Sequence, residues 1–176
     1  MGRNVEIKAK LSDFRRQHGR AAALADAGPE VVCQEDTFFH CSTGRLKLRE
    51  LGDGTGELIF YERPDAARPK PSDYVVSPTS DPGSLKAALS RALGVRGVVR
   101  KTRTVFIVGQ ARIHLDEVDG LGRFIELEVV LRPNQTPEQG TAVAEDLMAK
   151  LEIADGDLIE DAYIDLLGAR ENDDDA

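Results

Sequence analysis

The chain opens with the stretch NVEIKAKL at residues 4–11, in which polar and apolar side chains alternate without a break. Val5 and Ile7 belong to one face of this stretch, and Glu6 and Lys8 belong to the other. A period of two is typical of a β-strand, because successive side chains point to opposite faces of a sheet. The stretch therefore predicts a strand with one apolar face and one charged face.

The same alternation recurs along the chain and is interrupted by helix signals. Further strands are predicted at 34–39, 45–50, 57–63, 73–77, 98–108, 112–118 and 124–131. A first helix is predicted from Ser12 or Asp13 to about Ala27, where Gly28-Pro29 would end it, and a second from Asp81-Pro82 to about Leu93. A third is predicted to begin at the capping box Thr136–Gln139, and a fourth to cover Asp157–Leu167. Strands arriving mostly as hairpins, with helices between them, indicate an α+β fold built on a large antiparallel sheet or barrel with helices outside.

Length, composition and charge bound the class of protein. The 176 residues fit one domain, expected over residues 1–170, with an acidic disordered tail at 171–176. No apolar stretch approaches the roughly 20 residues that cross a bilayer, and the N-terminus lacks an apolar signal core, so we expect a cytoplasmic protein. The net charge of −8 argues against a general affinity for nucleic acid or anionic membrane. Cys33 and Cys41 are expected to be buried reduced thiols.

The charged faces of the predicted strands are sorted by sign. Most carry Lys or Arg in phase with the alternation, whereas the last strand carries Glu126 and Glu128. A charged face on one strand usually faces water, but this segregation suggests a barrel interior, where unpaired charge is very costly. A polyphosphate with metal ions would satisfy both sets. The candidate phosphate ligands are Lys8, Lys47, Arg49, Arg63, Lys101 and Arg103. The candidate ligands of Mg²⁺ or Mn²⁺ are Glu6, Glu126 and Glu128.

The order of these pieces resembles that of a known family. Residues 4–8 are similar to the E-x-E-x-K signature of the CYTH superfamily, the triphosphate tunnel metalloenzymes, which include class IV adenylyl cyclases, thiamine triphosphatases and inorganic triphosphatases. The run LDEVDGLGRFIELE at 115–128 is most similar to the class IV cyclase branch. The other similar segments are 36–39, 44–49, 61–63, 101–103 and 163–167. The resemblance covers residues 3–168 and implies a closed antiparallel eight-stranded β-barrel, the triphosphate tunnel, with helices packed outside.

The resemblance also implies roles for individual residues. Glu6 and Lys8 belong to the signature and are candidate catalytic residues. Asp116 is a third, which would orient a water, a metal or an attacking hydroxyl; a structural salt bridge to a barrel Arg is the alternative. Lys70, in the proline-rich loop, is a candidate substrate ligand near the barrel mouth. His114 shares the face of Asp116 and is expected to be a hydrogen-bonded structural residue; an acid or base is the alternative.

The predicted function is that of a class IV adenylyl cyclase-like enzyme acting on a nucleoside triphosphate with Mg²⁺ or Mn²⁺. One alternative is a phosphohydrolase of an inorganic or organic triphosphate, or of another organic phosphate. A third, of another class, is a non-catalytic module that binds a phosphometabolite. Asn4 keeps these open: it stands where the signature has its first Glu, so one metal position is expected to be weakened or the substrate less charged. The expected partner is a small-molecule phosphate, and a homodimer through a barrel edge or helix face is also open.

Overall fold

The structure is a computed structural model that describes residues 2–11, 13–64 and 66–174. Within these ranges the chain forms eight strands, four α-helices and one 3₁₀ turn at Asp155–Asp157. The strands are β1 (Gly2–Lys10), β2 (Ala27–Phe39), β3 (Arg45–Leu51), β4 (Gly56–Glu62), β5 (Lys70–Thr79), β6 (Val95–Val108), β7 (Ala111–Val118) and β8 (Gly122–Val130). The helices are α1 (Phe14–Leu24), α2 (Pro82–Leu93), α3 (Pro137–Leu151) and α4 (Tyr163–Asp174).

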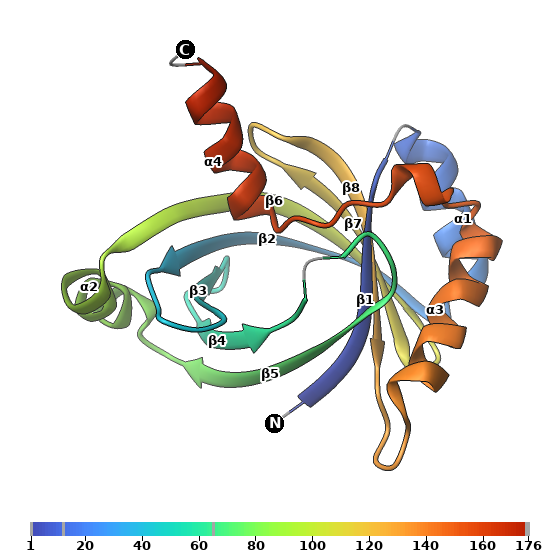
Figure 1. Cartoon of the computed structure of the whole chain (residues 1–176), viewed down its shortest axis with the longest axis horizontal. Coiled ribbons are helices and arrows are strands. Elements are labelled where there is room, and N and C mark those ends of the chain that lie inside the picture. The colour runs from blue at the N-terminus through green and yellow to red at the C-terminus, as the bar shows by residue number, and fades with distance from the viewer. Residues whose placement is uncertain (1, 12, 65, 175–176) are drawn as a thin grey trace.

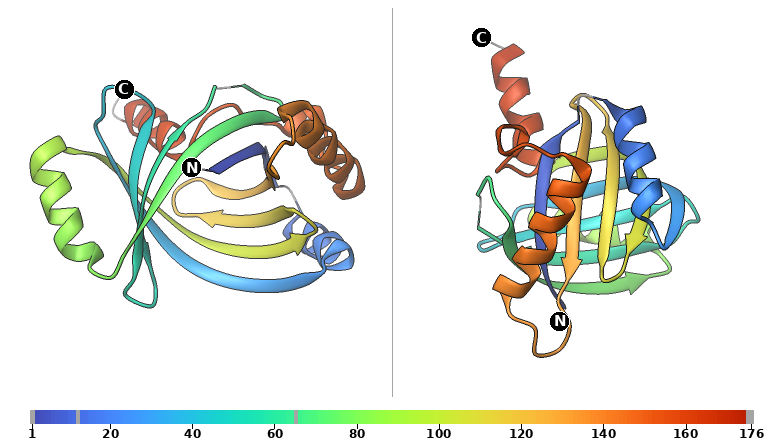
Figure 2. Two further views of the ribbon diagram at one scale, coloured as in Figure 1. Left: turned by 90° about the horizontal axis from the view of Figure 1, so that it is seen from below. Right: turned by 90° about the vertical axis from the view of Figure 1, so that its right-hand side faces the viewer.

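The strands close into one antiparallel barrel, as predicted. Their order around it is β1-β5-β4-β3-β2-β6-β7-β8, and β8 pairs back onto β1. Figure 1 and Figure 2 show the strands curving around a common interior, with the helices on the outside. Because side chains alternate along each strand, one face of every strand points into the barrel and the other points outward.

The apolar face of β1 packs outward, beneath α1 and α3. Val5 and Ile7 are buried in a cluster with residues of β7, β8 and α3, among them Leu115 and Leu147. Gly140 allows α3 to approach closely, because a Cβ there would come within 2.9 Å of a Val5 methyl carbon. Burying each large apolar side chain of this cluster contributes about 1.5–3 kcal/mol. The charged face of β1 is therefore left for the barrel interior.

The first helix ends earlier than the sequence suggested. It runs from the N-cap Asp13 to Leu24, and β2 already begins at Ala27; Ser12 lies outside the described residues. Gly28-Pro29 does not end the helix. It lies inside β2, where Gly28 has a positive φ of 106° and the pairing with β6 shifts register. Pairing with the long strand β6 determines this boundary, and a local helix pattern cannot reveal it. The caps predicted for α2 and α3 are confirmed. The predicted burial of Cys33 and Cys41 is wrong, because both side chains are exposed.

The last helix also differs from its prediction. Residues 158–162 are not helical: Leu158 bridges to Ala9, and the Ile159 N–H donates to the Lys8 carbonyl over 2.9 Å. Helix α4 begins only at Tyr163 and continues to Asp174, so the described part of the predicted disordered tail is helical. Residues 175 and 176 lie outside the described residues. Among the helices that the structure describes, none is long and apolar enough to cross a membrane.

Candidate functional site

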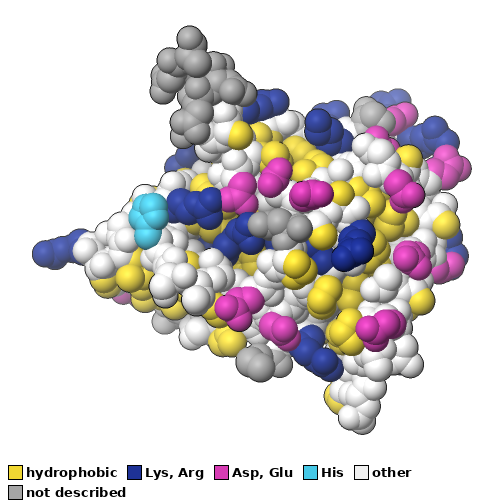
Figure 3. Space-filling model, in the orientation of Figure 1, with side chains coloured by type: hydrophobic (Ala, Val, Ile, Leu, Met, Phe, Trp, Pro, Cys, Tyr) yellow, Lys and Arg dark blue, Asp and Glu magenta, His cyan; other side chains and the backbone are white. Residues whose placement is uncertain are grey.

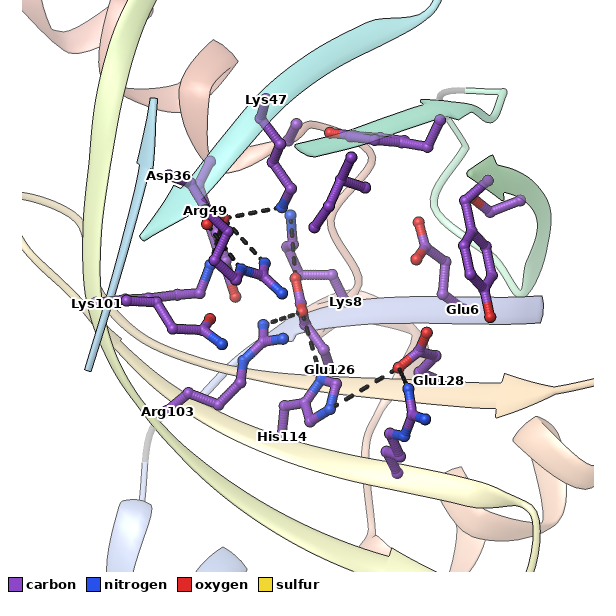
Figure 4. Close-up of a pocket in the computed structure, with 18 of the residues that line it drawn as sticks. Glu6, Lys8, Asp36, Lys47, Arg49, Lys101, Arg103, His114, Glu126 and Glu128 are labelled. Carbon is purple, nitrogen blue, oxygen red and sulfur yellow. Dashed lines mark hydrogen bonds and ion pairs between the residues drawn. The ribbon is translucent and has the colours of Figure 1, made fainter. Parts of the chain in front are cut away.

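The barrel encloses a pocket of about 620 Å³. All eight strands contribute side chains to its wall, together with Ala162 and Tyr163 at the start of α4. Nine of the predicted site residues line it: Glu6, Lys8, Lys47, Arg49, Arg63, Lys101, Arg103, Glu126 and Glu128. Figure 4 shows the labelled charged side chains pointing toward one another across this space, and the face in Figure 3 shows basic side chains with acidic ones on either side. Two predicted residues, Lys70 and Asp116, are not part of the wall.

One group of cations surrounds Asp36, a residue to which the sequence pattern gave no role. Its carboxylate accepts hydrogen bonds from Lys47 over 2.8 Å, from Lys101 over 2.9 Å and from Arg49 Nε over 2.8 Å. Asp36 is 1% exposed. In the β2–β3 register it lies directly opposite Arg49, which brings the two side chains to the same face. Asp36 belongs to segment 36–39, which was part of the family resemblance, but the sequence around it does not indicate that three cations would gather there.

The electrostatics of this group leave an excess of positive charge. Burial would raise the pKa of Asp36, but Arg49, Lys101 and Lys47 hold that pKa well below its usual range. Burial, with Arg49 beside it, lowers the pKa of Lys47 to about 7 although Asp36 opposes this. The pKa of Lys101 is also lowered by burial. Three basic groups share one carboxylate, so an anion entering the pocket would meet unneutralised positive charge.

A second group is centred on Arg103. Its guanidinium donates to Asp116 through Nε over 2.7 Å and through Nη2 over 2.5 Å, and Nη2 also donates to Glu126 over 2.5 Å. Asp116 is fully buried and also accepts the Tyr163 hydroxyl over 3.0 Å. Of the two interpretations offered for Asp116, the structure contains the salt bridge to a barrel arginine. Arg103 stands between Asp116 and the pocket.

The carboxylates on the opposite wall are also engaged. Glu6 accepts from Arg63 over 2.5 Å. Glu128 accepts from Asn4 Nδ2 over 2.7 Å and from Arg112 over 3.1 Å. Burial would raise the pKa of Glu128, but His114, Arg112 and the Asn4 amide lower it.

His114 lies between the two carboxylates of β8. Its Nδ1 is 3.8 Å from Glu126 and its Nε2 is 4.0 Å from Glu128. Burial, then Arg103, lowers the pKa of His114. Among the described residues Nδ1 has no hydrogen-bond partner, so the hydrogen bond expected for a purely structural histidine is missing at this atom.

The donor atoms on this wall fit a hard divalent cation in kind. Carboxylate and amide oxygens are the ligands that Mg²⁺ and Mn²⁺ prefer, and the buried Asn4 Oδ1, beside Glu128, has no hydrogen-bond partner among the described residues. In the described part of the chain, however, no three His, Cys, Asp or Glu side chains converge closely enough to hold a metal. Glu6 and Glu126 instead point to Arg63 and Arg103. A cation would therefore compete with these ion pairs.

Residues 158–163 cross one end of the barrel. Lys8 Nζ donates to the Asp161 carbonyl over 3.0 Å, and Lys70 Nζ donates to the Glu160 carbonyl over 2.8 Å. Lys70 also donates to the Ala66 carbonyl over 3.0 Å and is 2% exposed. It thus joins the proline-rich loop to the crossing segment rather than lining the pocket, which differs from the substrate contact that the sequence suggested.

A closed eight-stranded antiparallel barrel with an interior of Lys, Arg and carboxylate groups defines the class of triphosphate-tunnel barrels. The chain belongs to the CYTH domain family, whose sequence model matches residues 2–163. It is 28% identical to the adenylate cyclase CyaB of Aeromonas hydrophila over 139 residues, which is 72% of this chain and 68% of that protein.

Solved structures agree on the fold. The chain is similar to the PH1012 protein of Pyrococcus horikoshii OT3, with a TM-score of 0.83 and 23% identity over 93% of this chain and 98% of the other. It is also similar to a Hippeastrum adenylyl cyclase candidate described as having a dominant triphosphatase activity, with a TM-score of 0.63 and 15% identity over 93% and 92% of the two chains. At these identities the likeness is one of fold alone.

Proposed function

We propose that the chain is a metal-dependent enzyme that converts a nucleoside triphosphate inside the barrel, in the manner of a class IV adenylyl cyclase. Family membership and its relatives make the chain an enzyme, of the cyclase or the triphosphatase kind. The observation that carries the proposal is the pocket itself, in which Lys47, Arg49 and Lys101 share the single carboxylate of Asp36. The 28% identity to the Aeromonas hydrophila adenylate cyclase supports the cyclase over other phosphate chemistries.

The pocket residues divide the work of binding. Arginines offer phosphate a bidentate contact, and lysines offer a mobile point charge. We assign phosphate binding to the cations of the wall: Lys8, Lys47, Arg49, Arg63, Lys101 and Arg103. We assign Mg²⁺ or Mn²⁺ to Glu6, Glu126 and Glu128, and the ion would supply neutralisation of phosphate charge when bound.

In the proposed cyclase reaction, the ribose 3′-oxygen forms a bond to the α-phosphorus. The bond from that phosphorus to the bridging oxygen breaks, and pyrophosphate leaves with its electron pair. Glu6 faces the pocket and would accept the hydroxyl proton. Burial lowers the pKa of Lys8 to about 8, which suits a group that neutralises or protonates the leaving pyrophosphate near neutral pH. Asp116 acts through Arg103, whose guanidinium it orients.

The second candidate function is a triphosphatase, in which water attacks the terminal phosphorus and orthophosphate leaves. The crossing segment 158–163 is compatible with this reaction too, because a substrate that enters phosphates first would place its terminal phosphate beside Lys8 and Arg103. The dominant triphosphatase activity described for the Hippeastrum protein supports the same possibility.

The test is a product assay on the purified full chain. ATP, other nucleoside triphosphates, thiamine triphosphate and inorganic triphosphate are each supplied with Mg²⁺ or Mn²⁺, and cyclic nucleotide, pyrophosphate and orthophosphate are measured separately. Equal amounts of cyclic nucleotide and pyrophosphate are expected. Orthophosphate with the diphosphate product would instead establish the triphosphatase. Tight binding of a phosphate compound without any metal-dependent product would overturn both enzyme functions and favour the non-catalytic module that binds a phosphometabolite.

A further inference from the structure

Tyr163 lies at the crossed end of the pocket, beside Lys8 and beside the carboxylate that binds Arg103. It is the first residue of α4, is 6% exposed, and forms part of the pocket wall. Lys8 Nζ lies 3.8 Å from the centre of its ring. Its hydroxyl donates to Asp116 Oδ2 over 3.0 Å, and the same oxygen accepts Arg103 Nη2 over 2.5 Å. The ring therefore contacts Lys8 directly, has Lys101 Nζ farther from its centre at 5.7 Å, and reaches Arg103 through the Asp116 carboxylate.

The ring stabilises Lys8 without neutralising it. A buried ammonium loses water, and the negative face of an aromatic ring offsets part of that loss. The Asp161 carbonyl contributes in the same way, as a dipole without net charge. A carboxylate in the place of the ring would take up the charge of Lys8. Lys8 Nζ already lies 3.5 Å from Glu126 Oε1, and the ring adds no second negative charge, so part of the charge of Lys8 stays available to an incoming phosphate.

The hydroxyl acts on Arg103 through Asp116. Asp116 is fully buried and its two oxygens accept from the Nε–Nη2 edge of the guanidinium. The hydroxyl bond to Oδ2 fixes the carboxylate plane, and so the direction in which Arg103 points into the pocket.

The position of Tyr163 identifies the phosphate that these two cations would meet. The exposed residues of the pocket wall are Glu30, Val76 and Arg112. Arg112 and Asp116 are four residues apart on β7, which separates them by about 13 Å along the strand. The pocket is thus open at the Arg112 end, and the end crossed by residues 158–163 is the closed one. A nucleotide entering phosphates first would bring its terminal phosphate to Tyr163.

From these contacts we infer that Tyr163 is a positioning residue, which holds Lys8 and Arg103 in place for the terminal phosphate of a triphosphate. The inference rests on the proposed function in one respect, namely that a nucleoside triphosphate binds in this pocket. It makes no choice between cyclase and triphosphatase, because both require that phosphate to be held.

The test compares the dissociation constants of ATP and ADP, each with Mg²⁺, by calorimetry on the full chain. Tyr163→Met keeps an apolar side chain of similar reach but removes the ring and the hydroxyl. It is expected to weaken ATP binding about tenfold and ADP binding less than threefold. Tyr163→Phe keeps the ring and removes only the hydroxyl bond to Asp116, so it is expected to weaken ATP binding about threefold, less than Tyr163→Met does. The matched control is Tyr74→Met at another part of the wall, which should change both constants by the same factor.

Three outcomes would overturn the inference. A folded Tyr163→Met protein with an unchanged ratio of ATP to ADP affinity is the first. The second is a Tyr74→Met protein whose ratio of ATP to ADP affinity falls as much as that of Tyr163→Met. If Tyr163→Met does not fold, tetrafluorinated phenylalanine at position 163 replaces it, because it keeps the ring shape but weakens the negative face of the ring. The third contradicting outcome is that this variant binds ATP as tightly as Tyr163→Phe does. The proposed function is contradicted if the wild-type protein binds no triphosphate. This inference alone is contradicted if the wild type prefers ATP to ADP and every variant keeps the same ratio of ATP to ADP affinity.

Discussion

Raising the pH of the ligand-free protein from about 7.5 to about 9.5 is expected to stabilise it through Lys47. Burial, then Arg49, lowers the pKa of this side chain from an ordinary value of 10.5 to about 7, although Asp36 raises it. Between those two values the unfolded chain binds one proton more at this site than the folded chain does. The free energy of unfolding therefore rises with pH across this window.

The magnitude follows from the size of the shift. One proton of difference is worth nearly 1.4 kcal/mol per pH unit, so two units contribute about 2.5 kcal/mol. The side chain of Lys47 is only 13% exposed, so solvent screening reduces this little. The lowered pKa values of Lys101 and Lys8 act in the same direction. The raised pKa of buried Tyr163 acts only at higher pH, where it would reverse the trend.

The assay is urea unfolding followed by circular dichroism at three pH values within this window. The wild type is compared with Lys47→Met and with Lys150→Met, a control at an exposed lysine of α3. Lys47→Met is expected to gain about 2.5 kcal/mol less than the wild type over the range. The buffers contain no phosphate or sulfate, because an anion in the pocket would favour the protonated lysine. An equal gain in the wild type and in Lys47→Met would refute the argument.

Three further predictions concern the other charged groups. Glu126→Gln is expected to abolish metal-dependent turnover, since the pocket loses a hard anionic ligand; activity measured against Mg²⁺ concentration tests it, and an unchanged metal requirement contradicts it. Arg103→Ala is expected to cost about 3–5 kcal/mol in urea unfolding, because Asp116 stays buried without its cation, and Arg103→Leu combined with Asp116→Leu should recover most of that loss. Asn4→Glu is expected to lower the metal concentration for half-maximal activity by adding a carboxylate beside Glu128; turnover that falls at every metal concentration would show instead that the Asn4 amide contacts the substrate.

The alternating pattern predicted the strands well because it is a local property. Residues 4–11 are sufficient to predict β1, and the capping residues Asp13 and Asp81 begin their helices as expected. Closure into a barrel depends on pairing between strands that are far apart in the sequence. The closed barrel was predicted from the resemblance to the CYTH superfamily. The start of β2 was missed for the same reason: Gly28-Pro29 is a breaker in any local pattern, and only pairing with β6 makes it part of a strand.

The sequence pattern predicted which charged side chains face the barrel interior, but not which of them contact one another. The in-phase basic residues do face one interior, because the alternation fixes which face each side chain joins. Their partners were not predicted. Asp36 is one of three acids in β2, and its three cations come from β3 and β6. Lys70 was placed in the proline-rich loop and assigned to the substrate through the family resemblance. It is instead the first residue of β5, and its ammonium joins the loop to the crossing segment 158–163.

The balance of charge in the pocket explains why a metal ion should accompany the substrate. Among the described residues that line it, seven are Lys or Arg and six are Asp or Glu, a net charge of only plus one. A nucleoside triphosphate carries about four negative charges near neutral pH. The basic residues cannot neutralise it, because internal carboxylates such as Asp36 and Glu126 already use much of their charge. One divalent cation would bring the sum close to minus one. We therefore expect the pocket to take up the metal complex of a triphosphate in preference to the free anion.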